Sequence, residues 1–197
     1  MATLDLLSAS EAKAAANIDV STQDTEVAAL ITAVSLQLDN LCGPIVKRTV
    51  TSESHDGDRR VVFLRYRPVA SVSAVVEYAG ATATTLTAET AGSAGTYLVE
   101  PVPGEVRRRA SFSDQCFASG RRNVLVTYSA GRYDSTGVVG EQFKQAAKLA
   151  FTNLWRREQG VGTETFGAVA TQLVPGFALP NAVLDLLADE IQAPELS

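Results

Sequence analysis

The sequence has very few of the side chains that usually carry chemistry. Its 197 residues include one histidine, His55, and two cysteines, Cys42 and Cys116. Metal sites and Cys–His nucleophile pairs need several such ligands or partners at defined spacings. No phosphate-binding loop, dinucleotide fingerprint, nucleophile elbow or zinc-protease helix occurs, and the neighbouring carboxylates Asp189 and Glu190 would point apart on a helix. We therefore expect no enzyme, no metal and no cofactor.

Long apolar runs and a basic N-terminal segment are also missing. No stretch approaches the roughly 18 apolar residues of a membrane-spanning helix, and residues 1–5 lack the basic start of a signal peptide. The two cysteines lie far apart in unlike contexts. These features predict a protein with reduced thiols, made in the cytoplasm and without a membrane partner.

The charged residues are unevenly distributed along the chain. Hydrophobic residues make up 46% and charged residues 20% of the chain, which argues for a packed core and against disorder. The formal net charge of −5 divides into −5 for residues 1–44, +6 for 45–157 and −6 for 158–197. The pattern of acidic ends and a basic middle excludes a uniformly basic nucleic-acid binder.

Apolar periodicity predicts three helices before residue 160, over 8–18, 22–42 and 138–158. Ser8 and Glu11 have the spacing of a capping box at the start of the first. The second has one apolar stripe, formed by Val27, Leu30, Ile31, Val34, Leu38 and Leu41. The third has an inner stripe formed by Phe143, Ala147, Ala150, Phe151 and Leu154.

Residues 45–131 change to a period of two, which predicts short antiparallel strands separated by turns. Apolar residues alternate over 72–78, 97–99 and 124–128, and residues 61–64 form a further apolar run. The Ala, Thr, Gly and Ser tract at 79–96 indicates a flexible hairpin or loop. The predicted fold class is α+β: an N-terminal helix pair, a central antiparallel β-sheet or small barrel, and a long C-terminal helix followed by an extended arm and a short terminal helix.

The chain beyond the third helix is unusually apolar for a connection. Residues 160–179 carry Phe166, Val169, Leu173, Val174 and Phe177 among Gly, Ala and Thr, and 181–191 has the apolar spacing of a short helix. We therefore divide the chain into a single domain at 1–159, with the three helices packed together, and an arm with its terminal helix at 160–197.

Two groups of residues suggest competing functions. His55 lies in the sequence Ser-His-Asp-Gly-Asp at 54–58. This composition is typical of a turn, so a turn is favoured over the active site of a small hydrolase. Arg107–Arg109 and Arg121–Arg122 bracket a loop that could contact nucleic acid. Consecutive arginines on a strand alternate faces, however, and interleaved aromatics are missing. Ion pairs to an acidic protein surface are therefore favoured over nucleic-acid binding, which stays an alternative.

The order of these elements resembles the head–tail connector, or adaptor, proteins of long-tailed bacteriophages and gene-transfer particles. The segments that carry the likeness are 10–13, 24–31, 38–43, 67–72, 75–78, 124–133, 145–150, 155–158 and 179–187. They cover most of the chain in the right order. Residues 79–96 and 105–122 are not distinctive for the family, so the resemblance implies no role for them, and the 160–179 arm is a region in which such proteins vary.

The resemblance implies a structural protein of the virion neck, made in the host cytoplasm. Such proteins form rings, commonly dodecamers, that dock on the portal protein and present a surface to a stopper or other neck or tail-completion protein. Double-stranded DNA passes through the channel without sequence recognition.

The resemblance also directs attention to two candidate surfaces. In such proteins the C-terminal region often grips the portal, which makes a partner-binding segment of Phe166, Val169, Leu173, Val174, Phe177, Leu184 and Leu187. In a ring, the basic middle of one copy is expected to face acidic helices of a neighbour or of an adjoining ring. The candidates for these inter-subunit charge contacts are Arg107, Arg108, Arg109, Arg121 and Arg122.

Overall fold

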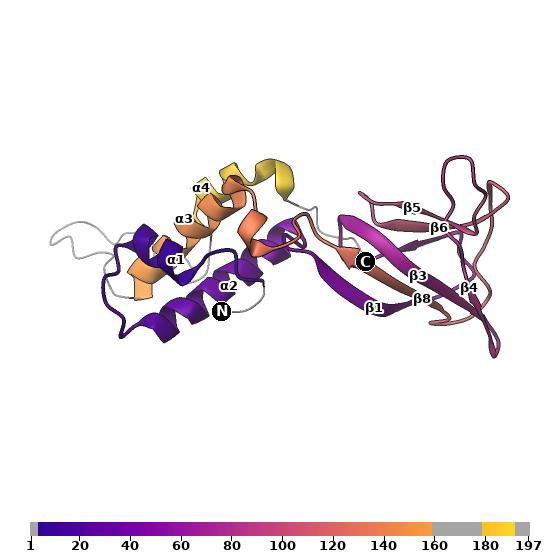
Figure 1. The fold of residues 1–197 in the computed structure, drawn as a ribbon, viewed down its shortest axis with the longest axis horizontal. Coiled ribbons are helices and arrows are strands. Elements are labelled where there is room, and N and C mark those ends of the chain that lie inside the picture. Colours follow the sequence, from indigo (N-terminus) through magenta and orange to yellow (C-terminus); the bar gives the residue numbers. More distant parts are fainter. Residues whose placement is uncertain (1–3, 159–178, 192–197) are drawn as a thin grey trace, which may run out of the picture. The chain divides into compact units, whose positions relative to one another are not determined.

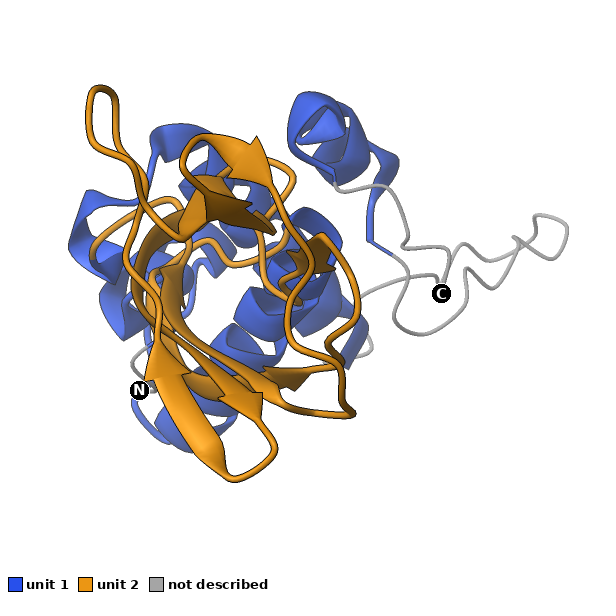
Figure 2. Cartoon of the chain, turned by 90° about the vertical axis from the view of Figure 1, so that its right-hand side faces the viewer, with its two compact units in different colours: residues 1–42, 135–197 blue, residues 43–134 orange. Residues whose placement is uncertain are grey.

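The computed structural model describes residues 4–158 and 179–191. The chain falls into two compact units, each with its own set of elements (Figure 2). Unit 1 consists of residues 1–42 and 135–197, and unit 2 is the continuous stretch 43–134. The β-rich middle of the chain is thus inserted between the two helical parts of unit 1.

Unit 1 is helical in its described residues (Figure 1). Its elements are α1 (Ala9–Ala16), α2 (Asp24–Cys42), the 3₁₀ turn η1 (Thr136–Val138), α3 (Glu141–Glu158), α4 (Asn181–Leu186) and the 3₁₀ turn η2 (Ala188–Glu190). α1, α2 and α3 pack on one another, and α4 packs on α3. The helices that begin and end the sequence therefore share one bundle.

Helix α1 begins where its capping signal predicts. The Ser8 hydroxyl accepts a hydrogen bond from the backbone N–H of Glu11, and the Glu11 carboxylate accepts one from the backbone N–H of Ser8. These bonds satisfy donors that the first helical turn leaves unpaired. They also hold the pKa of Glu11 below its ordinary value. Asn17, in the left-handed conformation, ends the helix.

The apolar stripes of α2 and α3 are buried as their spacing predicts. Buried side chains of these two helices include Val27, Leu30, Ile31, Val34, Leu38, Phe143, Ala147, Ala150, Phe151 and Leu154. Phe151 and Trp155 stack with ring centroids 6.1 Å apart. Cys42, at the end of α2, is buried as a packing residue, whereas Cys116 is exposed.

Unit 2 consists of two antiparallel sheets. Its strands are β1 (Arg48–His55), β2 (Val61–Phe63), β3 (Val69–Ala79), β4 (Thr82–Thr85), β5 (Tyr97–Glu100), β6 (Glu105–Ala110), β7 (Ser113–Asp114) and β8 (Val124–Ala130). The first sheet has the order β1-β8-β3-β4, and the second has the order β2-β6-β5 with β7 paired to β6.

Both sheets of unit 2 contribute to one apolar core. Alternate residues of β8 are buried, and they are joined in the core by residues such as Val75 of β3, Val62 of β2 and Val106 of β6. Phe117, in the loop before β8, completes the cluster. Residues 79–96 contain a hairpin, because β4 pairs with the end of β3.

The α+β class is confirmed, and the departures from the predicted elements are local. Strands β1 and β6 were not predicted, because their sequences contain several charged or hydroxyl residues and alternate weakly. Residues 54–58 are not all turn: Ser54 and His55 end β1, and the chain bends from Gly57 onward. The physical reason is that β8 pairs with β1 through His55, so tertiary hydrogen bonds extend the strand.

Candidate functional site

The predicted partner-binding segment lies largely beyond the described part of the chain. Phe166, Val169, Leu173, Val174 and Phe177 all fall outside the described residues. Leu184 is half-buried on α4, whereas Leu187 has no exposed surface. Val183 is also fully buried, and the side-chain amide of Gln142 on α3 donates to the backbone carbonyl of Leu186. We therefore assign Leu187 to the packing of unit 1, because a side chain without exposed surface cannot meet a partner.

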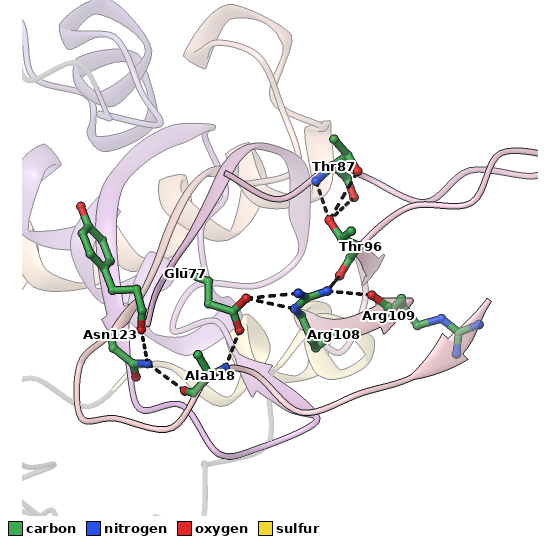
Figure 3. Close-up of polar contacts among 8 residues, drawn as sticks. Glu77, Thr87, Thr96, Arg108, Arg109, Ala118 and Asn123 are labelled. Atoms are coloured by element: carbon green, nitrogen blue, oxygen red, sulfur yellow. Dashed lines mark hydrogen bonds and ion pairs between the residues drawn. The ribbon is translucent and has the colours of Figure 1, made fainter. Parts of the chain in front are cut away.

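Arg108 is bound inside unit 2 by a buried carboxylate (Figure 3). Its Nη2 lies 3.2 Å from Oε2 of Glu77 on β3, and its Nη1 donates to the backbone carbonyls of Thr96 at 2.9 Å and Arg109 at 2.7 Å. The other carboxylate oxygen of Glu77 accepts from the backbone N–H of Ala118. Because Glu77 lies in the first sheet and Arg108 in the second, this cluster links the two sheets.

Arg107 and Arg109 also meet carboxylates of their own chain. Arg107 pairs with Glu105 on the same strand, 2.5 Å from Nη2 to Oε2. Arg109 pairs with Glu89 at 3.3 Å and with Asp114, and it donates to the backbone carbonyl of Phe112. The hydrogen bond to Asp114, with Glu89 assisting, raises the pKa of Arg109 above its ordinary value. The arginine triplet is thus engaged within unit 2.

Arg121 and Arg122 have exposed side chains in the loop before β8. Arg122 adopts a left-handed backbone conformation, with φ of 51°, and its backbone N–H donates to Oδ1 of Asp56. Its Nε donates to the hydroxyl of Ser54 at 3.1 Å. These contacts hold the backbone of the loop against the end of β1, while both side chains keep surface available for a partner.

A second polar cluster surrounds Glu53 on β1. Its Oε2 accepts from the Tyr128 hydroxyl at 2.6 Å, and its Oε1 accepts from the backbone N–H of Arg65 at 3.0 Å. Nε2 of His55 lies 3.1 Å from the same Oε1. Sequence reasoning missed Glu53, because no local pattern connects it with Tyr128, 75 residues away.

The environment of Glu53 shifts two pKa values in opposite directions. Burial alone would raise the pKa of Glu53, but contacts from His55, Tyr128 and the Arg65 backbone outweigh it and leave the pKa below its ordinary value. The pKa of Tyr128 is raised, first by burial and then by its hydrogen bond to the Glu53 carboxylate. The cluster therefore keeps a carboxylate and a neutral phenol paired, which is a structural arrangement.

A groove of about 340 Å³ lies beside this cluster, between the end of β1 and strand β2. It is lined by Ser54, His55, Asp56, Arg59, Val61, Val62 and Phe63. His55 contacts the carboxylate of Glu53, while Asp56 accepts a hydrogen bond from the backbone N–H of Arg122 and Asp58 accepts one from the hydroxyl of Ser119. Among the described residues, no group of three or more His, Cys, Asp and Glu side chains could hold a metal ion. None of the helices in the described ranges is long and apolar enough to cross a membrane.

Comparison with solved structures finds chains that have a similar fold. The full-length fold is similar to a chain in the neck of an empty gene transfer agent (GTA) particle computed with C6 symmetry, at a TM-score of 0.57 and 17% identity, covering 100% of this chain and 95% of that one. A chain of the native GTA virion matches at a TM-score of 0.56 and 17% identity, covering 97% and 92%. A chain of the native GTA neck computed with C12 symmetry matches at 0.52 and 17%, covering 100% and 98%. No curated protein matches the sequence.

The sequence itself matches a family model over nearly its whole length. The model describes head completion proteins and matches residues 5–189. The chain belongs to the head completion protein family. It is therefore a structural head-completion component, and not an enzyme. This membership confirms the family that the order of elements resembled.

Proposed function

We propose that this chain is a head–tail adaptor that forms a ring on the portal protein. The ring joins the portal to a stopper or other neck or tail-completion protein and leaves a channel for double-stranded DNA. The observation that carries the proposal is the family match over residues 5–189. The fold likeness to chains from GTA necks, computed with C6 and with C12 symmetry, supports a ring, and the dodecamer is the copy number that we propose.

The experiment is electron microscopy of particles made with and without this chain. The proposal expects density for the chain between capsid and tail, with twelve-fold symmetry. Without the chain, heads should accumulate without tails, and the complete chain supplied in trans should restore the junction. Normal particles without the chain, or density for it elsewhere, would overturn the proposal.

Portal docking is assigned to residues Phe166, Val169, Leu173, Val174 and Phe177, together with Leu184. The test should use point variants, because removal of residues 160–197 would also remove Val183 and Leu187, which are buried in unit 1. The double variant F166S/F177S should lose binding to purified portal protein. A matched control, A168S/A170S, changes small residues of the same segment and should bind as the unaltered chain does. Equal binding by both variants would contradict the assignment.

The inter-subunit charge contacts are proposed for Arg121 and Arg122. Both side chains are exposed, whereas Arg107, Arg108 and Arg109 meet carboxylates of their own chain. The same intrachain pairing reduces the positive charge that a nucleic-acid-binding module would need at the triplet. We therefore propose the adaptor function in preference to that alternative.

A further inference from the structure

Exposed apolar side chains lie on strand β2 and in the neighbouring turn between β5 and β6. Phe63, the last residue of β2, is 61% exposed, and Val102, in the turn between β5 and β6, is 80% exposed. The turn lies next to β2, because the backbone N–H of Leu64 donates to the carbonyl of Gly104 at 2.8 Å. Prolines 101 and 103 flank Val102 and are exposed as well. Apolar side chains grouped on a surface in this way mark interaction sites.

Strand register shows which other residues share this face. Val62 and Val106 are buried and paired, so their neighbours Val61, Phe63 and Arg107 point outward. Leu98 of β5 is opposite Arg107 and is half-buried. We call the surface formed by Val61, Phe63, Leu98, Val102 and Arg107 the β2 face. The groove of about 340 Å³ adjoins it, since Val61 and Phe63 also line that groove.

The charges around the β2 face identify the chemistry of its partner. Arg59, at the groove, and Arg65, just beyond β2, are exposed. Two acidic residues lie there as well: Asp56 also lines the groove, and Glu105, opposite Phe63, is paired with Arg107. Unit 2 as a whole has 12 basic and 9 acidic residues, a net charge of +3. Unit 1 has 5 basic and 13 acidic residues, a net charge of −8. Unit 1 also exposes large apolar side chains, including Leu36 on α2 and Leu149 on α3. An apolar anchor on a unit with net positive charge fits an acidic surface with exposed apolar side chains.

We propose that the β2 face of one copy docks on unit 1 of a neighbouring copy. This inference rests on the proposed function, because the neighbour is the adjacent copy in the ring. A contact between two different surfaces of the same chain is heterologous, and such contacts generate closed rings when the rotation between copies closes. Phe63 then acts as the aromatic anchor, and the groove beside it receives part of the neighbour's surface.

Photo-crosslinking within assembled particles tests the contact. Phe63 is replaced by p-benzoyl-phenylalanine, which keeps the aromatic ring, and purified particles are irradiated and analysed by mass spectrometry. A matched control places the same amino acid at Phe112, which is 53% exposed in the turn between β6 and β7, outside the β2 face. The expected result is a crosslink from position 63 to residues 1–42 or 135–197 of a second copy, with none to those segments from position 112.

The possible failures are distinguishable. If the chain is absent from purified particles, the proposed function fails. If the chain is present but position 63 crosslinks to the portal, to another neck protein, to unit 2 of a second copy or to nothing, the docking inference alone is overturned. A second variant, F63S/V102S, should fold, because both side chains are exposed, and should be incorporated at least tenfold less than F112S. Equal incorporation of the two would also overturn the inference.

Discussion

At the scale of single residues, the carboxylate of Glu77 shows how unit 2 manages a buried charge. It meets the Arg108 guanidinium through one oxygen and the backbone N–H of Ala118 through the other. A buried carboxylate is tolerated only when such partners replace its hydration. Arg108 is therefore needed less for its positive charge at the surface than for its pairing with Glu77.

Replacing Arg108 by methionine should destabilise the protein strongly. R108M keeps much of the apolar bulk of the side chain but leaves Glu77 buried without its cation, which costs about 3 kcal/mol in the free energy of unfolding. Urea unfolding followed by circular dichroism measures the change. The double variant R108M/E77Q should recover most of the loss, because glutamine still accepts from Ala118 without a charge.

The exposed Arg121 provides the matched control for that experiment. R121M removes an equal charge from a solvated position, so we expect a change within about 0.5 kcal/mol. If R121M destabilises the protein as much as R108M does, net charge rather than the buried pair determines the effect.

Glu53 should make the stability of the protein sensitive to acid. Its pKa is lower in the folded protein than its ordinary value of 4.5, so it stabilises the fold above that pH. This contribution is lost as the pH falls through the folded-state pKa. The variant E53Q lacks it, and its free energy of unfolding should therefore decrease less than that of the unaltered protein between about pH 5 and pH 3. Urea titrations at a series of pH values provide the measurement.

A control for the Glu53 prediction is E100Q, at the exposed end of β5. We expect its acid dependence to follow that of the unaltered protein. Parallel curves for E53Q and the unaltered protein would show that the Glu53 cluster does not supply acid-sensitive stability.

At the scale of elements, α4 is joined to the rest of unit 1 by a small apolar contact. Val183 and Leu187 are both fully buried, although the helix itself has only six residues. A helix of that length is not stable alone in water, so packing on α3 must hold it. The apolar spacing in 181–191 predicted a helix here, but it did not distinguish a partner-binding face from an internal one.

Variants of Leu187 and Leu184 should distinguish internal packing from binding to a partner. L187A creates a cavity in unit 1 and should lower the free energy of unfolding by about 2–5 kcal/mol. L184S changes a half-buried residue and should cost much less while weakening binding to the portal. Both effects are measurable by urea unfolding and by pull-down with purified portal protein. A small stability loss in L187A would contradict its assignment to packing.

At the scale of the whole molecule, the net charge of −5 is the sum of two unlike units. Unit 1 has a charge of −8 and unit 2 a charge of +3. The boundary between them falls in the chain at residues 42–43 and 134–135. In a ring, this separation favours contacts between the basic unit of one copy and the acidic unit of another.

High salt should therefore loosen the assembly. Raising the NaCl concentration from about 0.1 M to about 1 M shortens the screening length from about 10 Å to about 3 Å. The fraction of this chain retained on purified particles should fall, as measured by sedimentation and gel densitometry. The variant R121Q/R122Q should be released at lower salt than the unaltered chain. Retention that is independent of salt would contradict a charge-based assembly.

The sequence by itself determined the elements that depend only on residues close together in the chain. The capping box at Ser8, the apolar stripe of α2 and the alternation in β8 each follow from side-chain spacing, so their prediction required no knowledge of the fold. The family followed in the same way, because the order of such elements along the chain is a property of the sequence.

The tertiary structure decided the features that depend on distant partners. Glu77 and Arg108 are 31 residues apart, and Glu53 and Tyr128 are 75 apart. The pairing of β1 with β8 and the burial of Leu187 likewise depend on segments far along the chain. An ion pair or a buried side chain exists only once the chain brings its partners within a few ångströms. For that reason only the fold showed that Arg107, Arg108 and Arg109 pair with carboxylates of their own chain, whereas Arg121 and Arg122 have exposed side chains.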